Sequence, residues 1–128
     1  MKSLLTILTL VFTVMFSSTS FAEWTKIGVT NNGHTHYVDF ERIRKHKGFV
    51  YWWDMIDQPK PDERGILSTK AYMEGDCKLF RYRYLSISHH KKPMAGGTGD
   101  TSTYQDLRWE YPSPDSAGES KFKLVCSQ

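Results

Sequence analysis

The sequence predicts an α+β domain: an antiparallel sheet of about five or six strands with a C-terminal helix packed on one face. Runs in which apolar and polar residues alternate recur along the chain, and turns containing Gly, Pro or Asn separate them. Helical spacing of apolar residues, preceded by capping residues, occurs near the C-terminus. The 128 residues are enough for one domain and too few for two.

The first 22 residues have the pattern of a cleaved secretory signal peptide. Lys2 supplies the positive charge, residues 4–16 are mostly apolar, and small residues end the segment at Ala22. The apolar segment is shorter than the about 20 residues that span a membrane. No cysteine lies near the expected cleavage site, so we expect no lipid anchor. Residues 23–128 are therefore expected to form a single exported domain, periplasmic, secreted or at the cell surface, without a transmembrane segment.

The first two strands are predicted at residues 24–29 and 34–40. Asn32-Gly33 between them is the strongest short signal for a tight hairpin. Residues 41–47 are expected to form a polar connection or a single helical turn, which Gly48 ends.

The most apolar run, residues 49–56, predicts a central strand. Alternation places Trp53 on one face and Trp52 on the other. Since both faces are apolar, we expect a helix or a partner subunit to cover each of them. The prolines in residues 58–65 predict a long hairpin loop after this strand.

Two further strands are predicted at residues 66–74 and 78–88, joined by a turn at residues 75–76. Residues 89–100, rich in Lys and Gly, are expected to form a flexible loop. Residues 104–111 alternate and predict a last strand, with a short helix as the alternative.

The C-terminal segment carries helix-start signals. Ser113 before Pro114 is one candidate N-cap, and Ser116 three residues before Glu119 has the spacing of a capping box. Phe122, Val125 and Cys126 then fall on one helical face.

The two cysteines, Cys77 and Cys126, are expected to form a disulfide, because an exported chain meets an oxidising compartment. The closed loop is worth about 4 kcal/mol in the chain-entropy account. The alternatives are two buried free thiols or, less well matched to the wide spacing, a zinc site.

The order of landmarks along residues 24–126 resembles the bacterial surface-adhesin protein E-like family. This resemblance implies a small antiparallel sheet with a helix, cell-envelope localisation, a capacity to dimerise, and adhesin-type binding of host proteins. The landmarks are Trp24, Tyr37-Val38-Asp39, Ile43, Trp52-Trp53-Asp54, Ser68-Thr69-Lys70, Asp76-Cys77-Lys78, Arg81, Gly96-Gly97-Thr98-Gly99, Trp109, Pro112-Ser113-Pro114 and Val125-Cys126.

The best binding candidate in the sequence is a basic patch. Arg81 and Arg83 share one strand face, and Lys91 and Lys92 extend it into the next loop. Such a surface suits acidic host proteins, glycosaminoglycans or anionic lipid headgroups, although it also fits ordinary surface charge. The net charge of +3 is too small to imply a nucleic-acid partner. We therefore predict a non-enzymatic binding protein with a macromolecular partner and no cofactor.

The alternative function is a periplasmic protein that binds a small ligand or a metal. His34 and His36, with His89 and His90, supply imidazole ligands if the fold brings the two pairs together. A deep pocket lined by these histidines would favour this alternative, whereas a flat face with exposed aromatic rings and arginines would favour a protein partner.

Two weaker patterns complete the candidates. His89, Glu74 and Arg81 have the residue types of a ribonuclease-like site, which any exported basic domain also contains. Residues 96–99 can form an anion-binding nest or a flexible loop.

Overall fold

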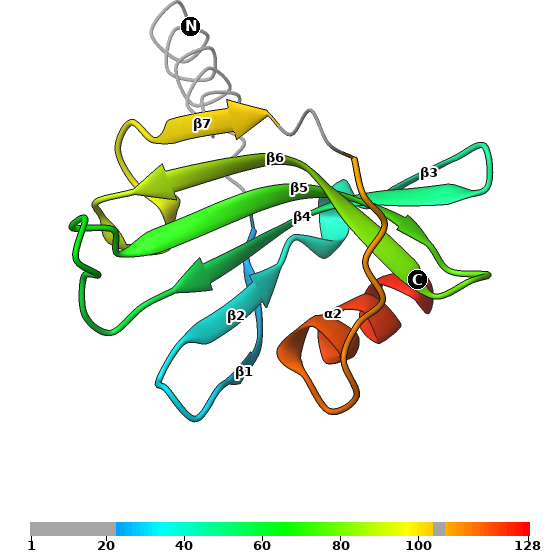
Figure 1. The fold of residues 1–128 in the computed structure, drawn as a ribbon, viewed down its shortest axis with the longest axis horizontal. Coiled ribbons are helices and arrows are strands. Elements are labelled where there is room, and N and C mark those ends of the chain that lie inside the picture. The colour runs from blue at the N-terminus through cyan, green and yellow to red at the C-terminus, as the bar shows by residue number, and fades with distance from the viewer. Residues whose placement is uncertain (1–22, 104–106) are drawn as a thin grey trace, which may run out of the picture.

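The computed structural model describes residues 23–103 and 107–128 (Figure 1). The predicted signal peptide, residues 1–22, lies outside the described residues. The described chain forms an antiparallel sheet with one C-terminal α-helix, which confirms the predicted fold class. Its strands are β1 (Thr25–Val29), β2 (Thr35–Val38), β3 (Arg44–His46), β4 (Phe49–Asp57), β5 (Ser68–Asp76), β6 (Arg81–His90) and β7 (Asp100–Thr103).

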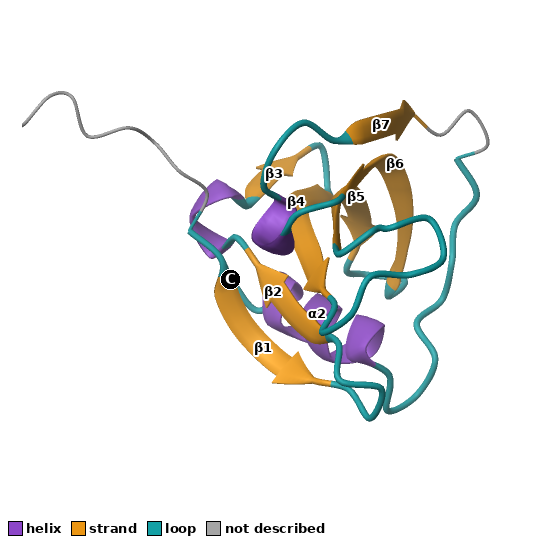
Figure 2. Cartoon of the chain, turned by 90° about the vertical axis from the view of Figure 1, so that its left-hand side faces the viewer, coloured by secondary structure: helices purple, strands orange, loops and turns teal. Residues whose placement is uncertain are grey.

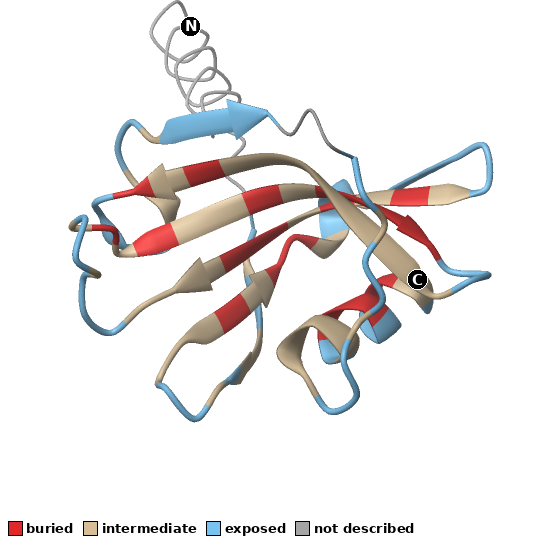
Figure 3. Cartoon of the chain, in the orientation of Figure 1, coloured by how far each residue is buried: buried red, intermediate tan, exposed pale blue. Residues whose placement is uncertain are grey.

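The strands follow the order β1-β2-β4-β5-β6-β7, and β3 pairs with the first half of β4. Two short 3₁₀ helices, η1 (Phe40–Arg42) and η2 (Pro93–Ala95), lie in the connections. The helix α2 (Ala117–Cys126) packs against one side of the curved sheet, below β4 in Figures 1 and 2. The sheet is longest and most buried in its middle strands, whereas β3 and β7 are exposed along their lengths (Figure 3).

The core lies between α2 and the middle of the sheet. Trp52 is 1% exposed, and its ring lies 5.4 Å from that of Phe122, which is fully buried. Gly75 on β5 lets the helix approach this closely, because a Cβ atom there would lie 2.3 Å from the Phe122 ring. Trp52 therefore belongs to the core, and Trp53 points to the opposite side.

Local chemistry fixes both ends of α2. At its start, the Ser116 side chain accepts a hydrogen bond from the Glu119 backbone N–H, so Ser116 rather than Ser113 is the N-cap. At its last residue, Cys126 is bonded to Cys77, with their Cα atoms 5.7 Å apart. This confirms the predicted disulfide.

Several element boundaries differ from the predictions. Residues 44–46, expected in a polar connection, pair with β4, and residues 75–76, expected in a turn, continue β5. The edge strand β7 comes from the end of the predicted flexible loop and the residues after it, because its Thr and Ser residues suit an exposed strand.

The predicted strand at residues 104–111 is wrong for its described part. Residues 104–106 lie outside the described residues, and within 107–111 the sole strand-like pairing is an isolated bridge between Glu110 and Tyr82. The alternating apolar pattern there reflects a single large anchor, Trp109, whose ring packs 5.7 Å from that of Phe49.

Candidate binding surface on the open face

The side of the sheet opposite α2 is called the open face, since no α-helix among the described residues covers it. Strand alternation and register place on it Phe49, Tyr51 and Trp53 of β4, Lys70, Tyr72 and Glu74 of β5, and Arg81 and Arg83 of β6. The helix α2 covers the Trp52 side of β4 as expected, and cover of the Trp53 side by a partner subunit stays a prediction. The 3₁₀ helix η2 does lie over one end of this face, where the Met94 N–H donates to the Asp57 carboxylate.

A row of aromatic rings crosses the middle of the open face. The Tyr72 ring lies 4.8 Å from that of Trp53 and 6.2 Å from that of Tyr51. The Lys70 ammonium sits 5.4 Å from the Trp53 ring centroid. All three rings are half-buried and present part of their area to solvent. Aromatic rings with one side in water are enriched in protein interfaces.

A basic hairpin borders this aromatic row. Arg44 pairs with Tyr51 and His46 with Phe49, and the hairpin turns at Lys47 and Gly48. We define the basic hairpin as Arg44, Lys45, His46 and Lys47, which are all exposed. An open cavity of about 610 Å³ lies between β3 and the Tyr51 and Tyr72 rings, and none of its lining residues is acidic.

Glu74 and Asp76 are acidic residues of the open face, and each forms an ion pair with an arginine of β6. The Tyr51 hydroxyl and the Arg83 guanidinium both donate hydrogen bonds to the Glu74 carboxylate. The bond to Glu74, together with burial, raises the pKa of Tyr51 to about 12, so the phenol stays protonated. Arg44 therefore adds positive charge beside the aromatic row, whereas Lys45 pairs with Val50 on the α2 side and donates to the Gln128 backbone carbonyl.

The predicted arginine pair lies on the open face but is not free. Arg83 forms an ion pair with Glu74, and Arg81 forms one with Asp76 at 3.2 Å. Both guanidinium groups also stack on Trp109, at 4.5 Å for Arg81 and 4.2 Å for Arg83. Their side chains are about a quarter exposed.

Lys91 and Lys92 lie beyond the other end of β6. Strand β6 begins at Arg81, ends at His90 and is 10 residues long. At about 3.3 Å per residue, the lysine pair therefore lies roughly 30 Å from the arginine pair. They border a cavity of about 300 Å³ with His89 and the Gly96-Gly97 backbone. The structure thus does not join the four predicted residues into one patch.

The predicted histidine pairs also stay apart, because β4 and β5 separate β2 from β6. His89 contacts the Thr69 hydroxyl, and His90 contacts Ser88 and the Gly96 carbonyl. Across the described residues, no three His, Cys, Asp or Glu side chains are grouped to hold a metal ion.

The residue types of a ribonuclease-like site are likewise dispersed. Glu74 pairs in register with Arg83, whereas His89 pairs with Thr69 five residues further along β5.

Sequence reasoning missed the basic hairpin. Its signal was present: four consecutive basic residues, 44–47, directly precede the most aromatic strand. The run predicts a polar connection or a single helical turn, because its apolar content is too low to predict a strand. Its pairing with β4 is a tertiary feature.

Comparisons with known proteins agree with this architecture. No curated protein matches the chain. A crystal structure of protein E from non-typeable Haemophilus influenzae has a TM-score of 0.59 at 15% identity, over 86% of this chain and 79% of that one. A second crystal form of Haemophilus influenzae protein E gives 0.60 at 13% identity, over 86% and 91% of the two chains. The model of the surface-adhesin protein E family matches residues 24–127. The chain therefore belongs to the surface-adhesin protein E family.

Proposed function

We propose that this protein is an exported, non-enzymatic adhesin-like protein whose open face binds an acidic protein of a host surface. The observation that carries the proposal is the basic hairpin beside the Tyr51–Tyr72–Trp53 row. Family membership supports an adhesin-like surface role. Charge favours this occupant, because Arg44 and Lys47 of the hairpin are exposed and the cavity beside it has no acidic lining.

The aromatic row favours a protein partner over a polyanion bound by charge alone. Tyr and Trp supply large contact areas with little loss of side-chain entropy, and they are enriched among residues that dominate binding energy. The half-buried rings beside the exposed Arg44 come closer to the flat aromatic and basic face expected for a protein partner than to a deep pocket lined by histidines.

Export is part of the proposal. The pattern of residues 1–22 supports secretion, and the Cys77–Cys126 disulfide fits an oxidising compartment. Among the described residues, no helix has the length and apolar character to cross a membrane. We propose a periplasmic, secreted or surface location without a lipid anchor, because no cysteine lies near Ala22.

The test compares two double variants of equal charge change against immobilised host matrix proteins and against heparin. Arg44→Gln/Lys47→Asn removes two charges from the basic hairpin, and asparagine tolerates the left-handed backbone of Lys47 (φ 51°). Lys91→Gln/Lys92→Gln removes two charges at the far end of β6. We expect about tenfold weaker protein binding for the first variant and less than about twofold for the second.

Added salt should weaken the wild-type contact, since exposed charges are screened over about 8 Å at physiological ionic strength. Binding by Arg81, Arg83, Lys91 and Lys92 stays a prediction, and selective loss in the lysine variant would support it over the basic hairpin. Unchanged binding in both folded variants would exclude both surfaces. Equal loss of heparin and protein binding would indicate a polyanion site instead.

A second copy of the chain is the other occupant that the open face could take. Sedimentation velocity on the purified protein measures this directly. A dimer that dissociates in the variant Trp53→Ser would place the interface on the open face, and a monomer at all concentrations would leave the face to other partners.

A further inference from the structure

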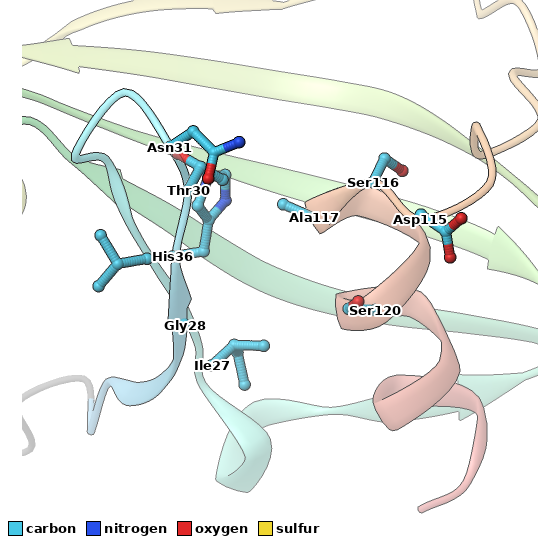
Figure 4. Close-up of a pocket in the computed structure, with 10 residues that line it drawn as sticks. Ile27, Gly28, Thr30, Asn31, His36, Asp115, Ser116, Ala117 and Ser120 are labelled. Atoms are coloured by element: carbon cyan, nitrogen blue, oxygen red, sulfur yellow. The ribbon is translucent and has the colours of Figure 1, made fainter.

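A cavity of about 300 Å³ lies where β6 ends and β7 begins, at the opposite end of β6 from Arg81 (Figure 1). Its volume is at the lower end of the roughly 300–1,000 Å³ typical of small-molecule sites. Another cavity, of about 420 Å³, lies between the β1–β2 hairpin and the start of α2 (Figure 4), but its lining has no lysine or arginine. The first of these, called the β6–β7 cavity, is lined by Ile66, His89, Lys91, Lys92, Gly96, Gly97, Thr98 and Asp100.

Buried side chains fix the loop that forms the β6–β7 cavity. The hydroxyl of Ser68, which is fully buried, donates to the Lys92 carbonyl at 2.6 Å and accepts from the Ala95 N–H at 2.8 Å. The ring of His90, which is 3% exposed, contacts the Gly96 carbonyl at 3.1 Å. The backbone is thus held on both sides of η2, so the wall of the cavity is formed before any ligand arrives.

Two lysines supply unpaired positive charge to this cavity. Lys91 and Lys92 are exposed, and neither forms an ion pair with another of the described residues. The stem of Lys92 packs on the glycine backbone, because a Cβ atom at Gly97 would lie 3.3 Å from the Lys92 Cδ atom. The Lys92 side chain therefore runs along the glycine wall of the cavity.

Uncharged donors line the same cavity. The His89 Nδ1 atom contacts the Thr69 hydroxyl at 3.1 Å, and among the described residues its Nε2 atom has no partner, although it is not shut off from solvent. With Nδ1 accepting from that hydroxyl, Nε2 carries the proton and can donate. The backbone N–H groups of Gly97 and Thr98 also lack an acceptor within the part of the chain that the structure describes. Unpaired N–H groups in a loop favour an anion.

Asp100 is the acidic residue of the lining, and its charge opposes an anion. It is exposed and pairs in register with His89 at the start of β7. The two lysines outnumber it, so the lining has a net charge of +1 without counting His89. The carboxylate should therefore weaken the binding of an anion without preventing it.

We propose that the β6–β7 cavity binds a phosphate monoester group, with the ammonium groups of Lys91 and Lys92 and the N–H groups of the glycine wall as donors. A monoester carries nearly two negative charges at neutral pH and has three strong acceptor oxygens, which suits this set of donors better than a singly charged carboxylate does. A soluble phosphate and a phosphorylated lipid headgroup share this chemistry. The site does not depend on the function proposed for the open face.

The probes are inorganic phosphate, glycerol 1-phosphate and the diester glycerophosphocholine. Calorimetry measures the affinity, and amide NMR shows which backbone groups respond. We expect inorganic phosphate and glycerol 1-phosphate to bind and to shift the Gly97 and Thr98 amide signals, with the diester at least about fivefold weaker. No binding at millimolar concentration, equal binding of the diester, or shifts confined to other parts of the chain overturns the proposal.

Two variants should change the affinity for glycerol 1-phosphate in opposite directions. Lys91→Gln/Lys92→Gln should weaken it about tenfold, whereas Asp100→Asn should strengthen it about twofold, because the first removes attraction and the second removes repulsion. Lys26→Gln/Lys78→Gln is the matched control: it removes the same charge outside the cavity and should change the affinity by less than about twofold. All five side chains are exposed, so the variants should fold, and circular dichroism checks this. Equal losses in the two double variants would reject the site.

Vesicles distinguish the two sources of the phosphate group. Phosphatidylcholine vesicles that contain phosphatidic acid present a monoester at a membrane, and those that contain phosphatidylglycerol present a diester. Co-sedimentation with the first kind, reduced in Lys91→Gln/Lys92→Gln, would support a lipid headgroup as the source. Binding of glycerol 1-phosphate without co-sedimentation would support a soluble phosphate. Equal co-sedimentation with both kinds would contradict recognition of a monoester.

Discussion

Trp109 shows how single residues can hold a chain segment without regular structure. Its ring packs against that of Phe49 at a tilt of 36° and lies beneath the guanidinium groups of Arg81 and Arg83. The same arginines neutralise Asp76 and Glu74, which are 7% and 6% exposed. Burial raises the pKa of Asp76, but hydrogen bonds from Leu79 and Arg81 outweigh it, so the net pKa is lowered. The arginines therefore stabilise the fold.

Replacing Arg83 or Arg81 by Ser should destabilise the protein. Each change leaves a nearly buried carboxylate without its cation and removes a stacking contact with Trp109. We expect the free energy of unfolding to fall by about 1–3 kcal/mol per substitution. Urea titration measures it, with exposed Lys91→Ser as the control, expected to change stability by less than about 0.5 kcal/mol. Arginine variants as stable as the lysine variant would contradict the structural role.

Sequence alternation predicted that Arg81 and Arg83 share a face, which the register confirms. Unbroken alternation would also put Ile87 on that face, but the register does not. A register shift opposite Tyr72 and Met73 intervenes, and Ile87 pairs with Ala71 and packs against the core. A bulge changes the side on which every later residue points, and it depends on the partner strand, which a single-strand pattern does not contain.

At the contact between β5 and α2, there is no space for an added side-chain atom at Gly75. Gly75 faces both Phe122 and Trp52, and these two rings also stack on each other. The glycine is thus required by packing, since its backbone is not in the left-handed region.

Gly75→Ala should lower the free energy of unfolding by about 1–3 kcal/mol, because overpacking forces buried rings to move. The added Cβ atom would lie 2.8 Å from the Trp52 ring, so the near-ultraviolet circular dichroism should change as well. Gly28→Ala is the matched control: it is also a strand glycine, but its Cβ atom would enter open space. Equal stability of the two variants would show that α2 adjusts freely.

Element types were predicted better than element ends. The hairpin at Asn32-Gly33, the central strand and the capped C-terminal helix all follow from local chemistry, so the sequence contains them. The short strands β3 and β7 do not, because both are exposed and owe their conformation to pairing with β4 and β6. The candidate binding surface depends on β3, so it could not be located before the pairing was known.

At the scale of the whole molecule, His36 should make stability depend on pH. Its pKa is about 4 in the folded protein and about 6.5 when unfolded. Between these values the unfolded chain binds the proton more readily, so stability is full above about pH 6.5 and falls as the pH drops toward 4.

The shift corresponds to a loss of about 3 kcal/mol across that range. Denaturant unfolding at pH 7, 5.5 and 4 measures it, and His36→Gln is the control, because glutamine does not titrate. A wild-type stability as flat as that of the variant between pH 6.5 and 4 would refute the assignment. The lowered pKa of Asp76 adds a further loss of stability in more acidic solution, where its carboxylate takes up a proton.

The disulfide also suggests an order in which the parts of the fold form. Strands β4, β5 and β6 are joined by neighbouring connections and can pair early, whereas α2 comes last in the chain. An isolated helix of its length is marginal in water, and its final residue, Cys126, is bonded to Cys77. Under the export proposed above, the newly made chain in the reducing cytoplasm would lack this bond, and side-chain packing against Trp52 alone would hold α2. Oxidation after export would then fix the end of the helix, so the fold would be completed outside the cytoplasm.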